Sequence, residues 1–314
     1  MSTGMGGLTG QEPADVDGDP GAELLREAEQ SLPGYLDLYR RWEKQHWSVF
    51  ELDLSADCRQ WQSAGEADRR KWFCLGRFPG FLLGEARAAE ELAGYVRAVP
   101  GEEPRIYLTT QLVDEARHVM FFKRYCQEVL GSDAGVFSPG GPASLLSPAT
   151  RHLFVTALGE TSAALLARPH DPLARARAVF LSHVVLEGSV AMSLMRVVWK
   201  DFRRLGVLPG FRQGIAALMR DETRHFLFGV RLLHDMVGED PAIREHLRRF
   251  LLDDLLPWIY AVLETPPRRV AELAPQGIDP GERRTFALAL LRRHLRALGV
   301  PDDLPPAAPA PAAA

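Results

Sequence analysis

The sequence Asp-Glu-x-Arg-His occurs twice in this chain, at residues 114–118 and again at residues 221–225. Both copies lie in long apolar segments, residues 107–129 and 210–236, which we expect to be helices. Residues three apart lie on one face of a helix, so each Glu points the same way as its His. A carboxylate and an imidazole from each of two helices form half of a two-metal carboxylate site, which a Glu from each of two further helices completes. One Glu-x-x-His arises by chance on a charged helix, but two copies in apolar helices are a specific signal.

Acidic residues in two other apolar segments are candidates for the missing half of this site. Glu187 lies in the middle of residues 180–198, which are nearly all apolar. An ionised Glu in such surroundings is costly unless a proton, a cation or an arginine neutralises it. Residues 81–99 offer Glu85, Glu90 and Glu91, which cannot all face one site at about 100° per residue. One of these three supplies the ligand, and Glu85 is preferred.

The candidate metal ligands are therefore Glu85, Glu115, His118, Glu187, Glu222 and His225. Carboxylates are hard ligands that favour iron or manganese, and the absence of cysteine ligands argues against a structural zinc site. The four carboxylates carry four negative charges, which match two divalent metals, and we assign these carboxylates a catalytic role together with the metals. Six protein ligands leave coordination positions open, as the activation of O2 requires.

Alternative interpretations exist for individual residues of this set. The two Glu-x-x-His pairs would be exposed salt bridges if Arg117 and Arg224 paired with them on the helix surface. The apolar neighbours of both repeats argue against this alternative. Glu187 would be structural if a buried arginine paired with it. His183, four residues before Glu187, is an additional ligand or, more commonly for such a residue, a core histidine.

The rest of the sequence predicts a single all-α domain. Helices are expected at residues 22–45, 81–99, 107–129, 148–167, 173–205, 210–236, 241–263 and 279–298, and Ser55 or Asp57 is expected to cap a further helix that ends near residue 75. The domain spans residues 21–300. Residues 1–20, rich in Gly, Asp and Pro, and the Pro/Ala tail of residues 301–314 are expected to be disordered.

Composition limits the partners and the location of the protein. A net charge of −4 gives no reason to expect a nucleic-acid partner. No run of about 18 uncharged apolar residues predicts membrane insertion, and no signal peptide is recognised before the first helix. The three cysteines lack metal-type spacing and suit a reducing compartment. These features predict a cytoplasmic protein.

Several stretches carry a resemblance to a known family: residues 47–57 (Trp-Ser-Val-Phe-Glu-Leu-Asp-Leu-Ser-Ala-Asp), Gly84-Glu85, residues 107–118 with Phe122, residues 183–188 and residues 221–229. Over residues 42–237 the chain resembles the ribonucleotide reductase small-subunit-like carboxylate proteins. It is most similar to the ligand-binding oxidases, which carry a manganese–iron centre and hold a long-chain fatty acid. The resemblance implies a ferritin-like four-helix bundle core with additional helices, a Mn/Fe or Fe/Fe centre, a fatty-acid-like ligand and a homodimer.

The resemblance also implies a role for each site residue. One metal is held by Glu85, Glu115 and His118 and the other by Glu187, Glu222 and His225, with Glu115 and Glu222 bridging or shared. Asp221 orients His118 and lies next to Trp47, while Asp114 orients His225. In the radical-generating subunits of this family, such a Trp–Asp–His chain carries an electron to the metal.

Departures from the family pattern narrow the expected function. Phe122 occupies the position of the radical-bearing Tyr, and the Pro/Ala tail lacks the Tyr and acidic residues that dock a large subunit. Ala88 and Ser182 replace the Val and Tyr that form an ether cross-link in the ligand-binding oxidases. Their smaller side chains are expected to leave space for a substrate near His183, and they count against the fatty-acid ligand itself.

The sequence thus predicts an O2-dependent oxidase or monooxygenase that acts on a small, partly apolar molecule or lipid and receives electrons from a separate donor. A radical-generating reductase subunit is disfavoured by Phe122 and the tail. An arylamine N-oxygenase would need an additional His four residues before the last Glu, where this chain has Leu218. A metal-storage protein would hold the same ligands without redox turnover.

Overall fold

The computed structural model describes residues 32–132, 146–265, 267–274 and 278–307, and this part of the chain contains helices and no strand. The all-α prediction is confirmed. The expected disorder of residues 1–20, the first part of the helix expected at residues 22–45 and the tail from residue 308 onward lie outside the described residues.

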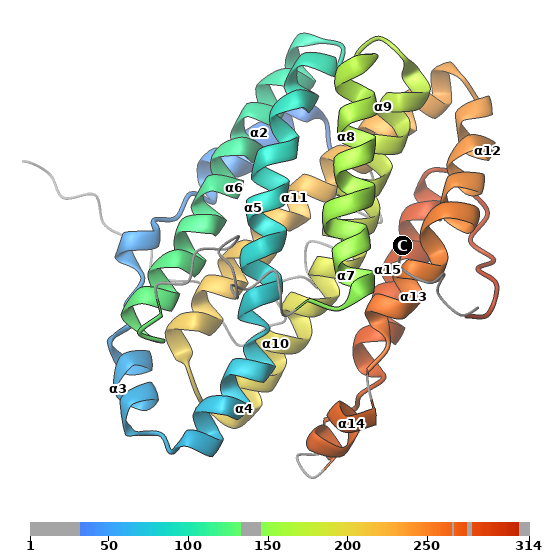
Figure 1. The fold of residues 1–314 in the computed structure, drawn as a ribbon. Helices are drawn as coiled ribbons and strands as arrows, with labels where there is room; N and C mark the ends of the chain where they lie inside the picture. Colours follow the sequence, from blue (N-terminus) through green and yellow to red (C-terminus); the bar gives the residue numbers. More distant parts are fainter. Residues whose placement is uncertain (1–31, 133–145, 266, 275–277, 308–314) are drawn as a thin grey trace, which may run out of the picture.

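Long helices form the centre of the molecule (Figure 1). They are α5 (Phe78–Ala98), α6 (Glu102–Glu128), the continuous α9 (Pro172–Val179), η4 (Phe180–Ala191) and α10 (Met192–Leu205), and α11 (Pro209–Glu239). Helix α5 packs against α6, and η4 packs against α11. With α9, η4 and α10 counted as one continuous helix, these elements form a four-helix bundle whose interior holds both copies of the repeated motif.

Shorter elements surround this bundle. Before it come α2 (Tyr35–Lys44), the short 3-10 turn η1 (Val49–Glu51), α3 (Ser55–Ser63) and α4 (Glu66–Gly76). Between α6 and α9 lie α7 (Pro148–Arg151), η3 (His152–Ala157) and α8 (Leu158–Ala167). After it come α12 (Ala242–Arg249), η5 (Phe250–Leu255), α13 (Leu256–Leu263), α14 (Pro267–Leu273) and α15 (Glu282–Ala297), along one side of the bundle in Figure 1.

The helix α6, which carries the first motif, begins five residues earlier than the sequence pattern predicts. Gly101, with φ of 90°, turns the chain, and Glu102 and Glu103 occupy the first turn. Acidic residues there interact favourably with the positive end of the helix dipole. Pro104 is tolerated because its missing N–H is one that the first turn leaves unpaired in any case. The helix therefore starts in a segment that lacks apolar periodicity.

Asp57 caps a helix, but not the one that the sequence predicted. Its carboxylate accepts hydrogen bonds from the backbone N–H groups of Gly210 and Phe211, both at 2.8 Å, at the start of α11. The Tyr125 hydroxyl donates to the same carboxylate at 2.9 Å. The expectation that Asp57 or Ser55 caps its own helix is wrong, since Leu54 precedes α3 and makes no side-chain cap. Asp57 instead fixes the start of the second motif helix against α3 and α6.

The segment η4, around Glu187, is a π-helix rather than an α-helix. The Met192 N–H lies in hydrogen-bond range of the Glu187 carbonyl, five residues back, and the Ser189 hydroxyl donates to the Val184 carbonyl. Wide turns of this kind are rare and occur most often at functional sites. Here the wide turn lies at the position of the candidate ligand Glu187.

Helices α11 and η4 approach closely at Gly229. A Cβ on Gly229 would lie 2.2 Å from the Cβ of His183. We expect Gly229→Ala to lower the free energy of unfolding by about 1–3 kcal/mol, because the side chain would force the two helices apart. Gly238 lies on the same helix, and no atom of the described residues lies within 4 Å of a Cβ there, so Gly238→Ala should raise the free energy of unfolding by about 0.4–1 kcal/mol. Urea unfolding of the two variants measures both; equal effects would contradict the close approach.

Residues 172–205 are long and apolar enough to cross a membrane, but 89% of the most apolar window is buried inside the protein.

Residues 301–307 of the tail that we expected to be disordered contact the domain: Arg248 donates to the Pro301 carbonyl at 3.0 Å, and the Tyr260 hydroxyl donates to the Pro305 carbonyl. The start of the tail is therefore held on the surface of α12 and α13.

Candidate metal centre

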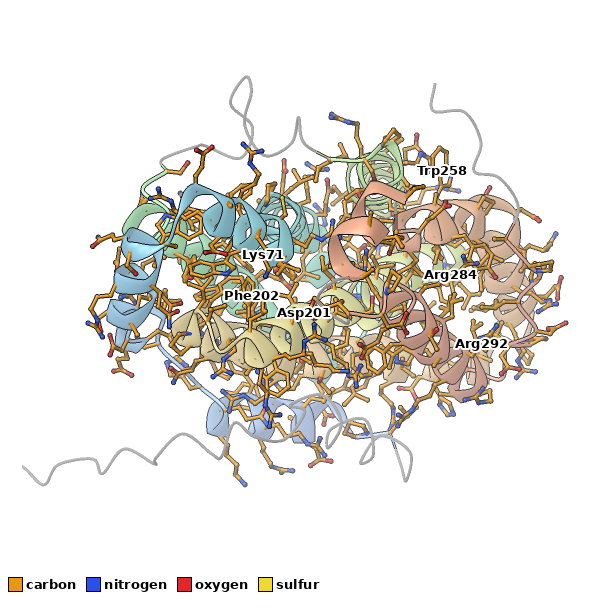
Figure 2. The ribbon with its side chains drawn as sticks, turned by 90° about the horizontal axis from the view of Figure 1, so that it is seen from below. Lys71, Asp201, Phe202, Trp258, Arg284 and Arg292 are labelled. Carbon is orange, nitrogen blue, oxygen red and sulfur yellow. The ribbon has the colours of Figure 1, made fainter. Side chains whose placement is uncertain are left out.

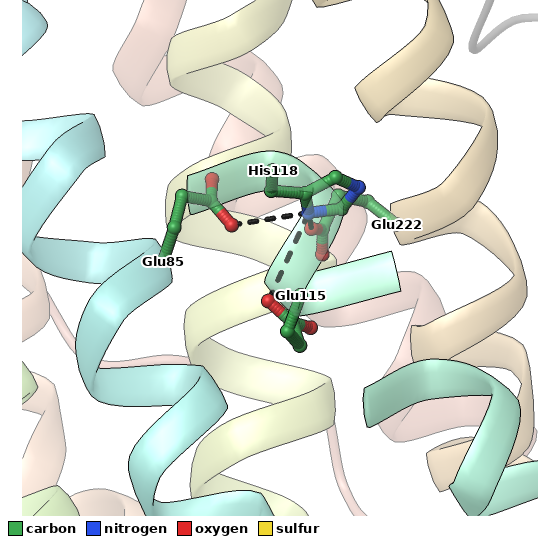
Figure 3. Close-up of side chains that lie close together, drawn as sticks. All are labelled: Glu85, Glu115, His118 and Glu222. Carbon is green, nitrogen blue, oxygen red and sulfur yellow. Dashed lines mark hydrogen bonds and ion pairs between the residues drawn. The ribbon is translucent and has the colours of Figure 1, made fainter. Parts of the chain in front are cut away.

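All the predicted ligands meet in the interior of the bundle. Glu85 comes from α5, Glu115 and His118 from α6, Glu187 from η4, and Glu222 and His225 from α11, and each is buried. Their oxygen and nitrogen atoms form two groups: Glu85, Glu115, His118 and Glu222, and Glu115, Glu187 and His225. Within each group the ligand atoms lie within 4.8 Å of one another. Figure 3 shows the first group, with Glu85 and Glu115 directed toward the His118 ring.

Glu115 and Glu222 lie between the two imidazole rings. The Nδ1 atom of His118 is 3.8 Å from Glu115 and 3.3 Å from Glu222. The Nδ1 atom of His225 is 3.3 Å from Glu115 and 3.7 Å from Glu222. Each of these two carboxylates therefore reaches both histidines, as ligands shared by two metals must. Glu85 contacts His118 alone of the two rings, at 3.1 Å.

The opposite ring nitrogens contact the aspartates of the repeats in a crossed arrangement. His118 Nε2 lies 3.2 Å from Asp221, and His225 Nε2 lies 3.1 Å from Asp114. An Nε2–H that donates to a carboxylate leaves Nδ1 as the free lone pair and directs it into the cluster. Both contacts match the sequence prediction, and so does the hydrogen bond from the Trp47 indole to Asp221, at 2.7 Å.

A second tryptophan repeats this arrangement on the other half of the site. The Trp42 indole N–H donates to Asp114 at 2.9 Å, so that Trp42, Asp114 and His225 mirror Trp47, Asp221 and His118. No sequence pattern predicted this contact. Trp42 lies on α2, in a part of the chain with no repeat, and only the packing of α2 against α6 brings it to Asp114.

The arginines of the two repeats form ion pairs with these aspartates, and Arg224 links one aspartate to the other. Arg224 is 1% exposed and donates to Asp114 at 3.0 Å and to Asp221. Arg117 donates to the other oxygen of Asp114, at 2.7 Å. The alternative of exposed salt bridges is therefore wrong. These ion pairs are buried and hold the two aspartates that position the histidines.

Gln111 is another residue of the site that was not predicted from the sequence. It lies four residues before Glu115 on α6, and its amide nitrogen is 3.2 Å from a Glu187 oxygen. Its carbonyl oxygen is 3.2 Å from His183 Nε2, and His183 Nδ1 is 2.6 Å from the Ser182 hydroxyl. Burial lowers the pKa of His183 to about 3, so this ring is neutral. His183 therefore supports Glu187 through Gln111, and the helical spacing to Glu115 was the signal for Gln111.

The acidic alternatives on α5 point away from the cluster. Glu90 and Glu91 both form ion pairs with Arg87, and Glu90 is exposed. Glu85 is 6% exposed and faces the imidazoles. The preference for Glu85 over its neighbours therefore agrees with the geometry.

Protons are bound tightly at this cluster when metal is absent. Burial raises the pKa of Glu85 to about 8 and that of Glu187 well above its usual range. Burial alone would lower the pKa of both histidines, but the surrounding carboxylates raise the pKa of His118 and His225 well above its usual value. The same contacts hold the pKa of Glu115 below its usual range, against the effect of burial.

The donor set fits two cations. Both oxygens of Glu115, one of Glu222 and Nδ1 of His225 are buried without a hydrogen-bond partner among the described residues. Buried polar atoms are normally satisfied, so a group of orphaned acceptors that face one another needs an explanation. Two metal ions bound among these atoms would satisfy all of them. The set is rich in oxygen, with one imidazole for each metal.

We expect the affinity of this cluster for Mn²⁺ to rise with pH between about 6 and 8. Glu85, Glu187, His118 and His225 all have raised pKa values, so each carries a proton at pH 7 that the metal must displace. Each competing proton should change the affinity by up to about tenfold per pH unit. Calorimetric titrations in two buffers of different ionisation enthalpy would measure the released protons. A flat pH profile without proton release would contradict the assignment.

A cavity of about 610 Å³ extends from this cluster to the surface. The carboxylates of Glu85, Glu115, Glu187 and Glu222 all line this cavity. Ala88 and Ser182, which the sequence analysis placed in a substrate pocket, line its wall. His183 was placed there too but is not among the lining residues; its Nδ1 contacts the hydroxyl of Ser182, which does line the cavity.

Residues 30–260 match the family model described as ribonucleotide reductase, small chain, which is most of the chain of 314 residues. The chain belongs to the ribonucleotide reductase small-chain family. The family resemblance and the ferritin-like bundle predicted from the sequence are both confirmed by this match.

Solved structures of an R2-like ligand-binding oxidase share the fold of this family member. One variant, with an anaerobically reconstituted Mn/Fe cofactor, has a TM-score of 0.71 and 24% sequence identity, over 84% of this chain and 93% of that chain. Another, with an aerobically reconstituted Mn/Fe cofactor, has a TM-score of 0.74 and 24% identity, over 84% of this chain and 94% of that chain. At this level of identity the similarity shows the fold.

Proposed function

We propose that this protein is a dinuclear metal oxidase that uses O2 to oxidise a small, partly apolar molecule bound in its cavity. The observation that carries the proposal is the buried cluster of four carboxylates and two imidazoles, with unpaired ligand atoms, whose carboxylates line a cavity of about 610 Å³. Pockets of this volume enclose small organic ligands. A substrate in the cavity would lie directly beside the cluster.

The proposed ligands are Glu85, Glu115 and His118 for one metal and Glu187, Glu222 and His225 for the other, with Glu115 and Glu222 shared. The Mn/Fe cofactor of the structural neighbours supports manganese plus iron or two irons as the metals. When bound, they supply the redox chemistry that activates O2. A monooxygenase reaction would consume O2, two electrons from a separate donor and two protons, and would convert a substrate C–H group into C–OH with release of water.

The chain's own residues orient the ligands and exclude water. Asp221 and Asp114 fix the ring orientation of His118 and His225, and Gln111 donates to Glu187. Phe122 is fully buried and stacks on Phe81, with ring centroids 5.2 Å apart. It offers no hydroxyl for a stored radical, which supports an oxidase over a radical-generating reductase subunit. Leu218 is likewise buried and apolar, and this counts against an arylamine N-oxygenase.

Metal loading with spectroscopic and diffraction readouts tests the proposal. The protein would be loaded anaerobically with Fe²⁺ and Mn²⁺, exposed to O2 and crystallised, with anomalous scattering recorded at the iron and manganese edges. We expect two metal peaks at the cluster and O2 consumption that depends on metal. Glu90→Gln, at an exposed position on α5, should behave as the unaltered protein. Metal-free clusters in protein supplied with excess metal would overturn the proposal, and stable Fe²⁺ in air would favour storage instead. We further propose that the protein is a cytoplasmic homodimer.

A further inference from the structure

Ser182 connects the cavity wall to the side chains that support Glu187. It lines the cavity and is 8% exposed, and its hydroxyl oxygen lies 2.6 Å from His183 Nδ1. His183 Nε2 contacts the Gln111 carbonyl oxygen at 3.2 Å, and the Gln111 amide nitrogen lies 3.2 Å from a Glu187 oxygen. A chain of hydrogen bonds therefore runs from the cavity wall to a proposed metal ligand.

The proton of the Ser182 hydroxyl is used inside the protein. Two acceptors are in range, Nδ1 of the neutral His183 ring at 2.6 Å and the Ala178 carbonyl oxygen at 3.1 Å. When the ring carries its proton on Nε2, Nδ1 accepts from Ser182. When the ring carries it on Nδ1, the ring donates to Ser182 and the hydroxyl donates to Ala178. A hydroxyl oxygen accepts up to two hydrogen bonds, so in both cases Oγ keeps a lone pair for a group in the cavity.

Tyr95 also lines the cavity, and its hydroxyl proton is used in the same way. The hydroxyl donates to the Ala178 carbonyl at 3.1 Å, so the oxygens of Tyr95 and Ser182 flank one carbonyl. The guanidinium donors of the cavity, Arg77 and Arg283, come from the residue before α5 and from α15. The wall at Ser182 therefore offers acceptors, and a ligand that binds there must supply the donor.

From this arrangement we infer that the substrate carries a hydroxyl or primary amino group that donates to Ser182, together with an apolar body. The inference rests on the proposed function, because it takes this cavity as the substrate site. An ionised carboxylate has no proton to donate and does not fit this position. Ser182 lies about one turn before Glu187 on η4, so the donor group is held beside the metal centre. Phe81, Leu92 and Leu186 also line the cavity and suit an apolar body.

Binding of 4-ethylphenol, 4-ethylaniline and 4-ethyltoluene to metal-free protein, measured by calorimetry at pH 7, tests this inference. The probes share a ring and an ethyl group and differ in carrying a hydroxyl, an amino or a methyl group. Ser182→Ala should weaken binding of at least one donor probe by about 3- to 10-fold, because one hydrogen bond is lost. It should change 4-ethyltoluene binding by less than about twofold, which also shows that the cavity of the variant is intact. The donor probe that loses more affinity identifies the substrate group as hydroxyl or amino.

The matched control is Ser193→Ala, which removes another buried hydroxyl. Ser193 lies farther along the same continuous helix, toward Asp201 and Phe202, which Figure 2 labels. Its hydroxyl donates to the Val190 carbonyl at 2.8 Å, and it is not among the residues that line the cavity. This variant should leave all three affinities unchanged.

Three results would overturn the inference: equal loss of all three probes in Ser182→Ala, no loss of either donor probe, or no binding of any probe. Donor probes that bind but ignore Ser182→Ala would be held elsewhere in the cavity, for example at Arg283. Since the assay needs no metal, its result is independent of the metal-loading test of the proposed function.

Discussion

Replacing Glu115 by Gln is expected to abolish binding of both metals, with a loss of more than about 100-fold in affinity. Glu187→Gln should mainly abolish binding of the one metal that Glu187 is proposed to hold. Glu115 belongs to both groups of ligand atoms, and Glu187 belongs to one. Replacing a residue that only orients a metal ligand lowers the metal affinity by about 10- to 100-fold, so replacing a shared ligand should lower it further. Gln keeps the volume of the side chain and removes the negative charge that offsets the metals. Metal content after loading and desalting measures the result.

Two controls separate ligand loss from misfolding. Glu90→Gln makes the same chemical change at an exposed position on α5 and should keep the full metal content. Far-ultraviolet circular dichroism should show unchanged helix content in Glu115→Gln, because the carboxylate oxygens of Glu115 accept no hydrogen bond from any residue that the structure describes. If Glu115→Gln kept both metals while Glu187→Gln lost them, Glu115 would not be the shared ligand.

The ligands could be predicted from the sequence because each depends on local helical geometry. Glu115 and His118 share a helix face whatever the tertiary structure, and the repeat gives the same geometry to Glu222 and His225. Glu187 was detectable because a lone carboxylate in an apolar helix needs a partner. The all-α fold follows from the same periodicity. These predictions needed no knowledge of how the helices pack.

Contacts between distant segments were not predictable in this way. Trp42 reaches Asp114 only because α2 packs on α6, and Asp57 caps a helix that begins more than 150 residues later. Arg283 reaches the cavity through the position of α15, which no motif specified. The family resemblance supplied Trp47 and Asp221, since residue spacing alone does not show that an indole far along the chain donates to that aspartate. Gln111 is the exception, because its spacing to Glu115 placed it on the ligand face.

Arg224→Met is expected to lower the free energy of unfolding of the metal-free protein by about 3–5 kcal/mol. Arg224 is buried between α6 and α11 and contacts both Asp114 and Asp221, which are themselves fully buried. Removing the guanidinium leaves Arg117 as the one repeat arginine that contacts these two buried carboxylates, a cost that the similar volume of Met does not recover. Chemical denaturation without metal measures the change, because bound metal would add its own stabilisation.

The control for the predicted cost of Arg224→Met is Arg70→Met. Arg70 forms an exposed ion pair with Glu66 on α4, and such pairs contribute about 0.3–0.5 kcal/mol. Both changes delete one guanidinium from a helix, so the difference between them isolates burial and the link between the two aspartates. A cost for Arg224→Met within about 1 kcal/mol of the control would mean that Arg117 and the two histidines suffice to compensate Asp114 and Asp221. A large cost would show that Arg224 is as much part of this centre as the Glu and His of its repeat.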